Sequence, residues 1–240
     1  MTEKAYKLLA IQENLTNRSA KDLIDRGVVY YQGKKLVMAR ALVDTKARFR
    51  IEEITKVKVI FEDEFIVAID KPAFVTSEQI AKKQGHRLLH RLDKETSGVL
   101  LLVKDDEFRT KAVEAFKKLE VKKEYLAWVS GMVVDTFTID KPILTIKNKN
   151  QAYSKIAEDG RDAVSIVTPL ELNGKLSKVK VMIKTGRTHQ IRVHLKSEGI
   201  PIIGDEMYGG KKDKRVMLHA SKIELLGYSF SSNEPKDFKV

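Results

Sequence analysis

One carboxylate, Asp93, stands between two cations, Arg91 and Lys94, in the stretch LLHRLDKETSGVLLLVK. The run GVLLLV in this stretch is apolar throughout, which predicts a strand buried on both faces. The residues TSG just before it are typical of a turn that leads into a strand. We therefore expect Asp93 at the mouth of a core strand, on a rigid scaffold with cations close by. This setting suits a reacting group, and it equally suits an ordinary structural salt bridge.

Two other segments carry groups that can take part in chemistry. Tyr125 lies in KKEYLAW, which has the pattern of a strand. The segment KTGRTHQIRVHL predicts a strand, a turn and a helix, with Arg187 at the start of the helix and Arg192 in its first turns. An arginine beside a carboxylate keeps it ionised and orients it through a planar two-point contact. Each feature alone has a simpler explanation, because a strand tyrosine usually packs and GRTHQIR can bind phosphate without catalysis.

Several other chemistries lack their motifs. The chain has no cysteine, which excludes disulfides, thiolate metal sites and a cysteine nucleophile. It contains no P-loop, no GxGxxG and no GxSxG turn. The five histidines form no HExxH motif, so zinc chemistry, including zinc-dependent deamination of bases, loses support. We expect no metal site.

The charge balance points to a polyanionic partner. The 240 residues include 45 Lys and Arg against 33 Asp and Glu, a formal net charge of +12. Such a balance favours nucleic acid first and an anionic membrane second. The N-terminus lacks the apolar core of a signal peptide, and no run approaches the length of a membrane span. The absence of cysteine suits a reducing cytosol, so we expect a cytoplasmic protein.

Residues 1–55 are expected to form a small separate module. The pattern predicts a short first helix, then a second helix with Asn17 as its N-cap and Gly27 at its C-terminal end. VVYYQGKKLV then predicts two short strands around a turn. Residues 1–60 contain 13 Lys and Arg against 7 Asp and Glu, so a quarter of the chain carries half of the net charge. Arg18, Lys21 and Arg26 share one exposed face of the second helix, which is either merely solvated or contacts phosphates.

Residues 57–240 are expected to form a second, larger domain. Strand patterns outnumber helical ones and do not alternate strictly with them, which favours an α+β domain with a curved, mainly antiparallel sheet. Helices are expected over 105–120 and in THQIRVHLKSEG, where Ile191 and Leu195 lie four residues apart. Residues 145–162 are polar and basic, and we expect them to form an exposed loop.

Taken together, these segments resemble known families. HRLDKETSGVLLLVK, KKEYLAWVSG and GRTHQIRVHL, in that order, closely resemble the RNA pseudouridine synthases of the RluA-like family. IDKPA, GDEMYGG and RVMLHASKIEL are secondary matches, and the resemblance covers roughly residues 57–240. The segment NRSAKDLIDRGVVYYQGKKL resembles the S4 RNA-binding module, which often precedes such a domain in members that modify ribosomal RNA. The resemblance implies the pseudouridine synthase catalytic fold, a mixed and mainly antiparallel sheet with flanking helices.

The resemblance also implies roles for individual residues. Asp93 matches the catalytic aspartate, and Tyr125 matches the active-site tyrosine that stacks near the uracil. Arg187 matches the arginine that is paired with the aspartate. Arg91 matches an arginine that enters the space left by an everted base. The remaining substrate-binding residues are expected to be His90, Ile191 and Arg192, with Ile191 in the wall of the pocket.

The implied reaction explains why one carboxylate is enough. Conversion of uridine to pseudouridine breaks N1–C1′, turns the uracil and joins C5 to C1′, with no redox step, so no cofactor is expected. A hydrolase must also place a water, which usually requires a second carboxylate. We expect structured RNA as the partner and a monomeric protein. Large-subunit (23S) ribosomal RNA is the first expectation and tRNA the second. A non-catalytic RNA-binding or ribosome assembly factor and a nucleoside hydrolase are the alternatives from other classes.

Overall fold

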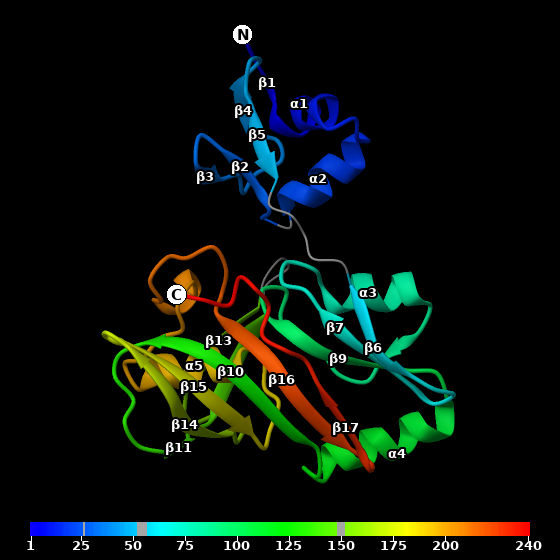
Figure 1. Ribbon diagram of the computed structural model, residues 1–240, viewed down its shortest axis with the longest axis vertical. Coiled ribbons are helices and arrows are strands. Elements are labelled where there is room, and N and C mark those ends of the chain that lie inside the picture. The colour runs from blue at the N-terminus through cyan, green and yellow to red at the C-terminus, as the bar shows by residue number, and fades with distance from the viewer. Residues whose placement is uncertain (26, 52–56, 148–151) are drawn as a thin grey trace. The chain divides into compact units, whose positions relative to one another are not determined.

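The computed structural model describes residues 1–25, 27–51, 57–147 and 152–240. The chain divides into two compact units, Met1–Lys56 and Val57–Val240. Figure 1 shows the two units and labels most of their elements.

The first unit combines two helices with short strands. Its elements are β1 (Thr2–Lys4), α1 (Ala5–Gln12), α2 (Asn17–Asp25), β2 (Val29–Tyr31), β3 (Lys34–Lys35), β4 (Leu42–Asp44) and β5 (Phe49–Ile51). Strand β1 pairs with β4, and β2 pairs with both β3 and β5. The buried side chains of the two helices, including Leu9, Ala20 and Ile24, form its core with apolar residues of the strands.

The local signals in this unit were largely correct. Gly27 has a φ of +73°, and its N–H donates to the carbonyl of Ile24, as expected of a glycine that ends a helix. Gln32 and Gly33 both have positive φ, the geometry of the tight turns that join twisted strands. The N-cap prediction was wrong by one residue, because the hydroxyl of Thr16 accepts the hydrogen bond from the N–H of Ser19. Asn17 is the first helical residue instead.

The second unit is built on one large sheet. Its strands are β6 (Lys58–Glu62), β7 (Ile66–Lys71), β8 (Arg87–Leu88), β9 (Ser97–Val103), β10 (Lys122–Ser130), β11 (Phe137–Asp140), β12 (Ile143–Lys147), β13 (Ala152–Ile156), β14 (Val164–Asn173), β15 (Leu176–Ile183), β16 (Leu218–Leu225) and β17 (Tyr228–Ser231). The helices are α3 (Ser77–Gln84), α4 (Asp106–Lys117), α5 (Gln190–Ser197) and the short 3₁₀ helix η1 (Glu206–Tyr208). Along the main path of the sheet the order is β11-β14-β15-β10-β16-β9-β7-β6.

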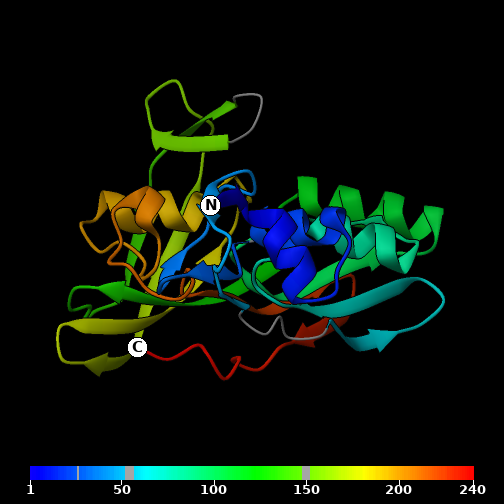
Figure 2. The same cartoon turned by 90° about the horizontal axis from the view of Figure 1, so that it is seen from above.

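This architecture confirms the predicted α+β class with a mixed, mainly antiparallel sheet. The parallel pair among these strands joins β9 to β16, and the other pairings in the sheet are antiparallel. Figure 2 shows the helices of this unit on one side of the sheet. Helix α4 packs Ala112 and Ala115 against Ile66, Val99 and other core residues. In the described ranges, no helix is long and apolar enough to cross a membrane.

Strand β9 lies in the middle of this core. All seven of its residues are buried, which confirms the prediction from the GVLLLV run. Where β9 runs parallel to β16, Gly98 lies opposite Ala220. A Cβ at Gly98 would lie 2.1 Å from the carbonyl oxygen of Ala220, and its φ is +112°. Only glycine therefore allows the two strands to approach this closely.

The expected loop over residues 145–162 was wrong in most of its described part. β12 and β13 form an antiparallel hairpin there, whose tip, residues 148–151, lies outside the described residues. The apolar positions Ile143 and Ile156 pack with Ala163, Val193 and Tyr208. Figure 2 shows the hairpin projecting from the helical side of the sheet. Tertiary packing of one face of the hairpin therefore gives a strand pair to a segment whose composition is that of a loop.

Candidate active site

A small hollow of about 90 Å³ contains most of the predicted site residues. Its lining includes Arg91, Asp93, Tyr125, Arg187, Ile191 and Arg192. These residues come from three separate segments: the loop before β9, strand β10, and the turn and first residues of α5. The structure thus brings together groups that lie almost a hundred residues apart in the chain.

The sheet register explains how Tyr125 comes close to the loop before β9. Gly98 on β9 lies opposite Ala220 on β16, and Ala220 lies opposite Tyr125 on β10. Tyr125 is thus two strands away from the start of β9, which the Asp93 loop directly precedes. The register between β10 and β16 shifts between Glu124 and Tyr125. Irregularities of this kind often re-aim a side chain beside a functional site.

The loop that carries Asp93 is held by its backbone. Ser77, at the start of α3, accepts a hydrogen bond from the N–H of Leu92 and donates one to its carbonyl, at 3.0 and 3.1 Å. The carbonyl of Lys94 accepts from the N–H of Phe74 at 2.7 Å and from Nζ of Lys71 at 3.3 Å. These contacts on both sides of Asp93 fix its position before any substrate binds.

Lys71, from the IDKPA segment, is fully buried under this loop. Besides the Lys94 carbonyl, its ammonium donates to the carbonyls of Pro72 and Val75, at 3.0 and 2.7 Å. Burial lowers the pKa of Lys71 to about 7, although the negative charge of Glu95 opposes this shift. The lysine therefore ties residues 72–75 to the loop that carries Asp93.

Asp93 is paired with a buried arginine. Its Oδ2 lies 3.3 Å from Nη1 of Arg192, and its side chain is 27% exposed, so the other side of the carboxylate stays open. Arg192 is itself 4% exposed and makes a two-point contact with Asp205, at 2.7 and 2.8 Å. Burial alone would lower the pKa of Arg192, but hydrogen bonds and charge from Asp205, with Asp93, outweigh it and raise that pKa. The guanidinium is therefore a permanent cation at the site.

The predicted pairing of Arg187 with Asp93 differs from the structure. Arg192 is the arginine that contacts Asp93, whereas Nε of Arg187 donates to the backbone carbonyl of Asp162 at 2.9 Å. The reason is helical geometry, since Arg192 lies inside α5 on its buried face and Arg187 lies in the preceding turn. Arg187 still lines the hollow, at its more exposed rim.

His90 also differs from its prediction as a substrate-binding residue. It is not among the residues that line the Asp93 hollow. Its Nε2 accepts a hydrogen bond from the backbone N–H of Leu101 at 3.1 Å, and its ring lies near Phe116. Burial lowers the pKa of His90 to about 4, so the ring is neutral and able to accept at Nε2. His90 supports the strand rather than facing the hollow.

Tyr125 and Arg91 occupy contrasting environments in the hollow. Tyr125 is 9% exposed. Burial, with the charge of Asp93 in addition, raises the pKa of Tyr125 above its ordinary value, so its hydroxyl stays protonated. Arg91 is 73% exposed and forms an ion pair with Glu78 at 2.7 Å. A neutral phenol thus lies in the wall, and a solvated guanidinium stands at the rim.

Three residues that the sequence did not assign belong to the contacts around Asp93, and His189 is the one that stands beside it. Nε2 of His189 lies 3.9 Å from Oδ2 of Asp93, and Nδ1 of His189 lies 2.8 Å from the hydroxyl of Tyr208. Asp205 is a third unassigned residue, through its contact with Arg192. His189 lies in GRTHQIRVHL, while Asp205 and Tyr208 lie in GDEMYGG. Both segments were recognised as matches to the family, and this was the signal that could have pointed to these residues. The match alone did not indicate a role for His189, Asp205 or Tyr208.

A buried polar network supports the start of β9 from behind. Arg215 donates to the hydroxyl of Ser97 at 2.6 Å, and Ser97 lies 2.8 Å from Nδ1 of His219. Because the serine oxygen accepts from Arg215, its own proton is free for His219. Nε2 of His219 lies 3.1 Å from the carbonyl of Ser232, to which it can donate. Burial lowers the pKa of His219, in keeping with a neutral ring in this chain of hydrogen bonds.

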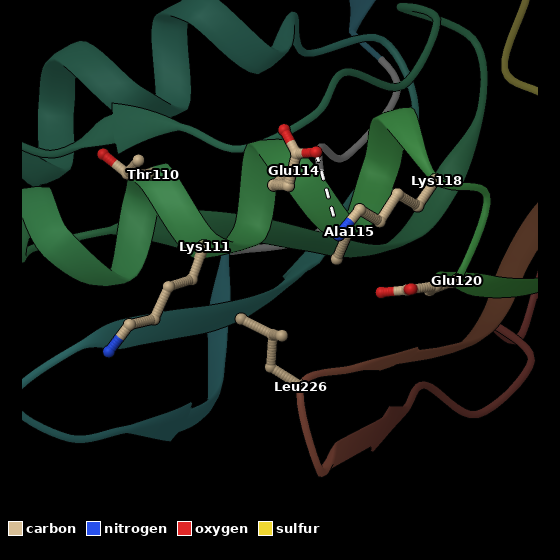
Figure 3. Close-up of a pocket in the computed structure, with 7 residues that line it drawn as sticks. All are labelled: Thr110, Lys111, Glu114, Ala115, Lys118, Glu120 and Leu226. Atoms are coloured by element: carbon tan, nitrogen blue, oxygen red, sulfur yellow. Dashed lines mark ion pairs between the residues drawn. The ribbon is translucent and has the colours of Figure 1, made fainter.

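A larger hollow of about 400 Å³ lies elsewhere, between α4 and the turn that joins β16 to β17. Figure 3 shows Thr110, Lys111 and Glu114 projecting from this one helix and Lys118 from its C-terminal end, with Leu226 across from them. Glu114 lies 3.9 Å from Lys118, and both side chains are more than half exposed. The hollow is open, and its charges are hydrated, so it offers no preorganised group for chemistry.

The residues predicted to bind RNA in the first unit lie partly outside the described chain. Arg18 is exposed on α2, and Nζ of Lys21 lies 4.3 Å from the centre of the Tyr6 ring. Arg26 lies outside the described residues. In the part of the chain that the structure describes, no group of three or more His, Asp or Glu side chains is arranged to hold a metal ion.

Comparisons with known proteins show what this chain is similar to. A family model described as RNA pseudouridylate synthase matches residues 66–197. A Helicobacter pylori (strain J99) protein named "Uncharacterized RNA pseudouridine synthase" is 52% identical, over 99% of this chain and 100% of its own length. Ribosomal large subunit pseudouridine synthase C of Rickettsia typhi is 31% identical, over 93% of this chain and 82% of its own.

A solved structure with a related name is also similar to this chain. Human RNA Pseudouridylate Synthase Domain Containing 1 superposes with a TM-score of 0.67 and 25% identity, covering 79% of this chain and 87% of that one. The match to the family model and the 52% identical relative show that this chain belongs to the RNA pseudouridine synthase family. It is an isomerase that acts on RNA.

Proposed function

We propose that this protein isomerises a specific uridine of large-subunit ribosomal RNA to pseudouridine, with Asp93 as the reacting group. The observation that carries the assignment of Asp93 is its open carboxylate in the hollow, with a buried arginine on one side. Ribosomal RNA is favoured because the relatives from Rickettsia typhi and Pseudomonas aeruginosa are named ribosomal large subunit pseudouridine synthases. The net charge of +12 suits binding to a long polyanion.

The reaction needs a carboxylate and a proton carrier. Asp93 either adds to C1′ of the ribose or removes the C2′ proton to give a glycal, and the N1–C1′ bond breaks in both routes. The uracil turns and C5 joins C1′; in the glycal route the proton taken from C2′ returns to C2′ at this step. C5 then loses its proton and N1 gains one, so the product has the mass of the substrate. Tyr125 is proposed to help move the C5 proton. Because its hydroxyl is protonated in the free protein, it can act as a base only after passing that proton on.

The remaining residues at the hollow are proposed to hold the nucleotide. A uridine in structured RNA must leave its stack, which costs a few kcal/mol. Arg91 at the exposed rim can stack on bases or bind phosphate, so we propose that it fills the space left by the uridine. Ile191, 4% exposed, is proposed as the apolar wall against the uracil, and Arg187 as a contact to RNA at the rim.

The first unit is proposed to be an S4-like module that binds RNA. Residues 1–60 have 13 Lys and Arg against 7 Asp and Glu, and Arg18 is exposed on α2. Replacement of Arg18 and Lys21 by alanine should weaken RNA binding and reduce the slope of log K against log salt by about 1 to 2, because phosphate contacts release counterions. An unchanged slope in filter-binding titrations would remove this assignment.

The target can be tested by mapping modified sites. RNA from cells that lack the gene is treated with carbodiimide, and pseudouridine adducts are located by stops in reverse transcription. We expect one or more stops in large-subunit ribosomal RNA to disappear and to return with the wild-type gene but not with Asp93→Asn. Loss of a stop in tRNA instead would make tRNA, the second candidate, the target.

The alternatives from other classes lose their basis. Membership of the synthase family argues against a non-catalytic assembly factor and against a nucleoside hydrolase. Release of free uracil during the reaction would revive the hydrolase. A cytoplasmic location and a monomeric state stay predictions, and gel filtration with light scattering tests the second.

A further inference from the structure

His189 has an unusual backbone for its position. It precedes helix α5 with a φ of +53°, in the left-handed region that few residues other than glycine occupy. Its ring is held at a right angle to Tyr208, with centroids 5.6 Å apart, and its side chain is 12% exposed. Strained backbone of this kind persists where the surroundings over-determine it, often at functional sites. The ring is thus placed by contacts rather than by its own preference.

The proton on the His189 ring follows from its partners. The hydroxyl of Tyr208 accepts a hydrogen bond from the backbone N–H of Ser154 at 2.9 Å. Tyr208 is 1% exposed, and burial raises its pKa to about 12, so it keeps one proton to donate. The described acceptor within reach is Nδ1 of His189, at 2.8 Å. If His189 donated instead, the tyrosine proton would have no partner, which is costly for a buried group. The neutral ring therefore carries its proton on Nε2.

Nε2 is the ring atom that faces Asp93. Its distance of 3.9 Å to Oδ2 is too long for a hydrogen bond in the free protein. Such contacts at catalytic sites often tighten when substrate binds. Nη1 of Arg192 approaches the same oxygen, Oδ2, at 3.3 Å. Among the described residues, no side chain forms a hydrogen bond or an ion pair with Oδ1.

We propose that His189 is a positioning residue that directs its Nε2–H at Oδ2 of Asp93, so that Oδ1 is the oxygen that reacts with the ribose. The proposal rests on the proposed role of Asp93. Tyr208 fixes the tautomer of His189, and Ser154 on the β12–β13 hairpin fixes Tyr208. Arg192, Glu95 and Asp205 also act on the charge of His189. Burial lowers the pKa of His189 although Asp93 opposes the shift, which supports a neutral ring at neutral pH.

Two substitutions at His189 separate positioning from a structural role. In His189→Gln the side-chain amide can reach the place of Nε2 and donate to Asp93. In His189→Asn the amide reaches only the place of Nδ1, but asparagine tolerates the left-handed backbone better. A purely structural role therefore predicts that Asn is the better replacement, and a positioning role predicts that Gln is.

The measurement is the single-turnover release of tritium from total RNA labelled with [5-³H]uridine and taken from cells lacking the gene. We expect His189→Asn to lower the rate about 10-fold and His189→Gln to stay within about 3-fold of wild type. The dissociation constant for the RNA should change less than about 2-fold in both variants. A wild-type rate in His189→Asn, or a rate above that of His189→Gln, would overturn the proposal.

Tyr208→Phe tests the tautomer through a double-mutant cycle. It should lower the rate by itself, because the ring of His189 then loses the contact that keeps its proton on Nε2. It should add little to the loss in His189→Asn, because that variant already lacks the Nε2–H. Full additivity would overturn the coupling. His194→Gln is the matched control, since His194 is a buried histidine of the same helix bonded to Ser165 and Lys141. It should keep the wild-type rate per folded molecule, and an equal loss there would overturn a specific role for His189.

Asp93→Asn distinguishes this proposal from the one on which it rests. If Asp93→Asn keeps its activity, the role of Asp93 fails and the role of His189 fails with it. If Asp93→Asn is inactive while His189→Asn releases tritium at the wild-type rate, only the role of His189 fails.

Discussion

The two hollows of the second unit differ, and the smaller one holds the more deeply buried charge. The hollow beside α4 has a volume of about 400 Å³, yet its charged residues come from one helix and the following turn and are largely solvated. The Asp93 hollow has about 90 Å³, and its groups come from three segments. Arg192 in its wall is 4% exposed and is held by two carboxylates, Asp93 and Asp205.

The difference lies in how much each charge depends on the fold. An exposed ion pair loses little water and contributes roughly 0 to 1 kcal/mol. A buried guanidinium has given up its water and relies on its partners, so removal of one partner is costly. Volume therefore says little about which hollow does chemistry, whereas buried charge held from several elements says much. Four substitutions test this contrast, from the largest expected effect to the smallest.

Asp93→Asn should have the largest effect. It removes the reacting oxygen charge but leaves the contact between Arg192 and Asp205, so the protein should still fold and bind RNA. We expect the single-turnover rate to fall more than about 10³-fold. Tritium release measures the rate, and circular dichroism checks the fold. The same carboxylate-to-amide change at Glu114, in the larger hollow, should leave the rate unchanged.

Asp205→Asn should have the largest effect on stability. It leaves the guanidinium of Arg192 buried with a neutral amide in place of its two-point partner. We expect a loss of about 3 kcal/mol in the free energy of unfolding, measured by urea denaturation. Asp237→Asn is the matched control, because Arg215 is 2% exposed but its partner Asp237 is 47% exposed. An equal loss in both variants would mean that burial of the acid does not matter.

Lys71→Met should change how stability depends on pH. In the folded protein burial lowers the pKa of Lys71 to about 7, from 10.5. Below the lower value the lysine is protonated in both states, and the folded state carries the full penalty of the buried charge. Between the two values the unfolded chain binds a proton that the folded chain does not, so stability rises with pH. Above the upper value the penalty is gone.

The stability of the wild type relative to Lys71→Met should therefore increase over that window, by up to about 1.4 kcal/mol per pH unit. Urea unfolding curves at several pH values measure it. Parallel curves for the two proteins would show that the buried ammonium does not titrate in this range.

Glu114→Gln should have the smallest effect. Its ion pairs with Lys117 and Lys118 are 3.8 and 3.9 Å long and exposed. We expect a change below about 0.5 kcal/mol in the free energy of unfolding, close to the error of the measurement. A loss of about 2 kcal/mol or more by urea denaturation would mean that the open hollow also depends on held charge, and the contrast would fail.

The fold was predictable wherever local signals agree with tertiary packing. The GVLLLV run became β9, and the helix expected over 105–120 became α4 with Asp105 as its N-cap. The β12–β13 hairpin was missed because its polar composition resembles a loop, and only contacts with α5 and Tyr208 make it a strand pair. Strand β17 was also not expected, although it pairs with β16.

The sequence named most residues of the Asp93 hollow but not their pairings. Asp93, Tyr125 and Arg192 were named from the segments that carry them, and they line one hollow. The family resemblance implied Arg187 as the partner of Asp93, but Arg192 makes the contact. Spacing along the chain could not show this, because it does not tell which side of α5 faces the loop. Asp205, His189 and Tyr208 were missed for a related reason, since each acts through a contact between separate segments.

Residue types and their order along the chain determined the family, the core strand and the acid Asp93 in front of it. Local chemistry suffices for these, because a buried strand, a turn and a basic surface each follow from neighbouring residues. The tertiary structure decided which arginine contacts Asp93 and which ring nitrogen of His189 faces it. It also decided which hollow holds buried charge. Those choices depend on strand register and burial, which bring Arg192 and His189 to 3.3 and 3.9 Å from the carboxylate of a distant segment.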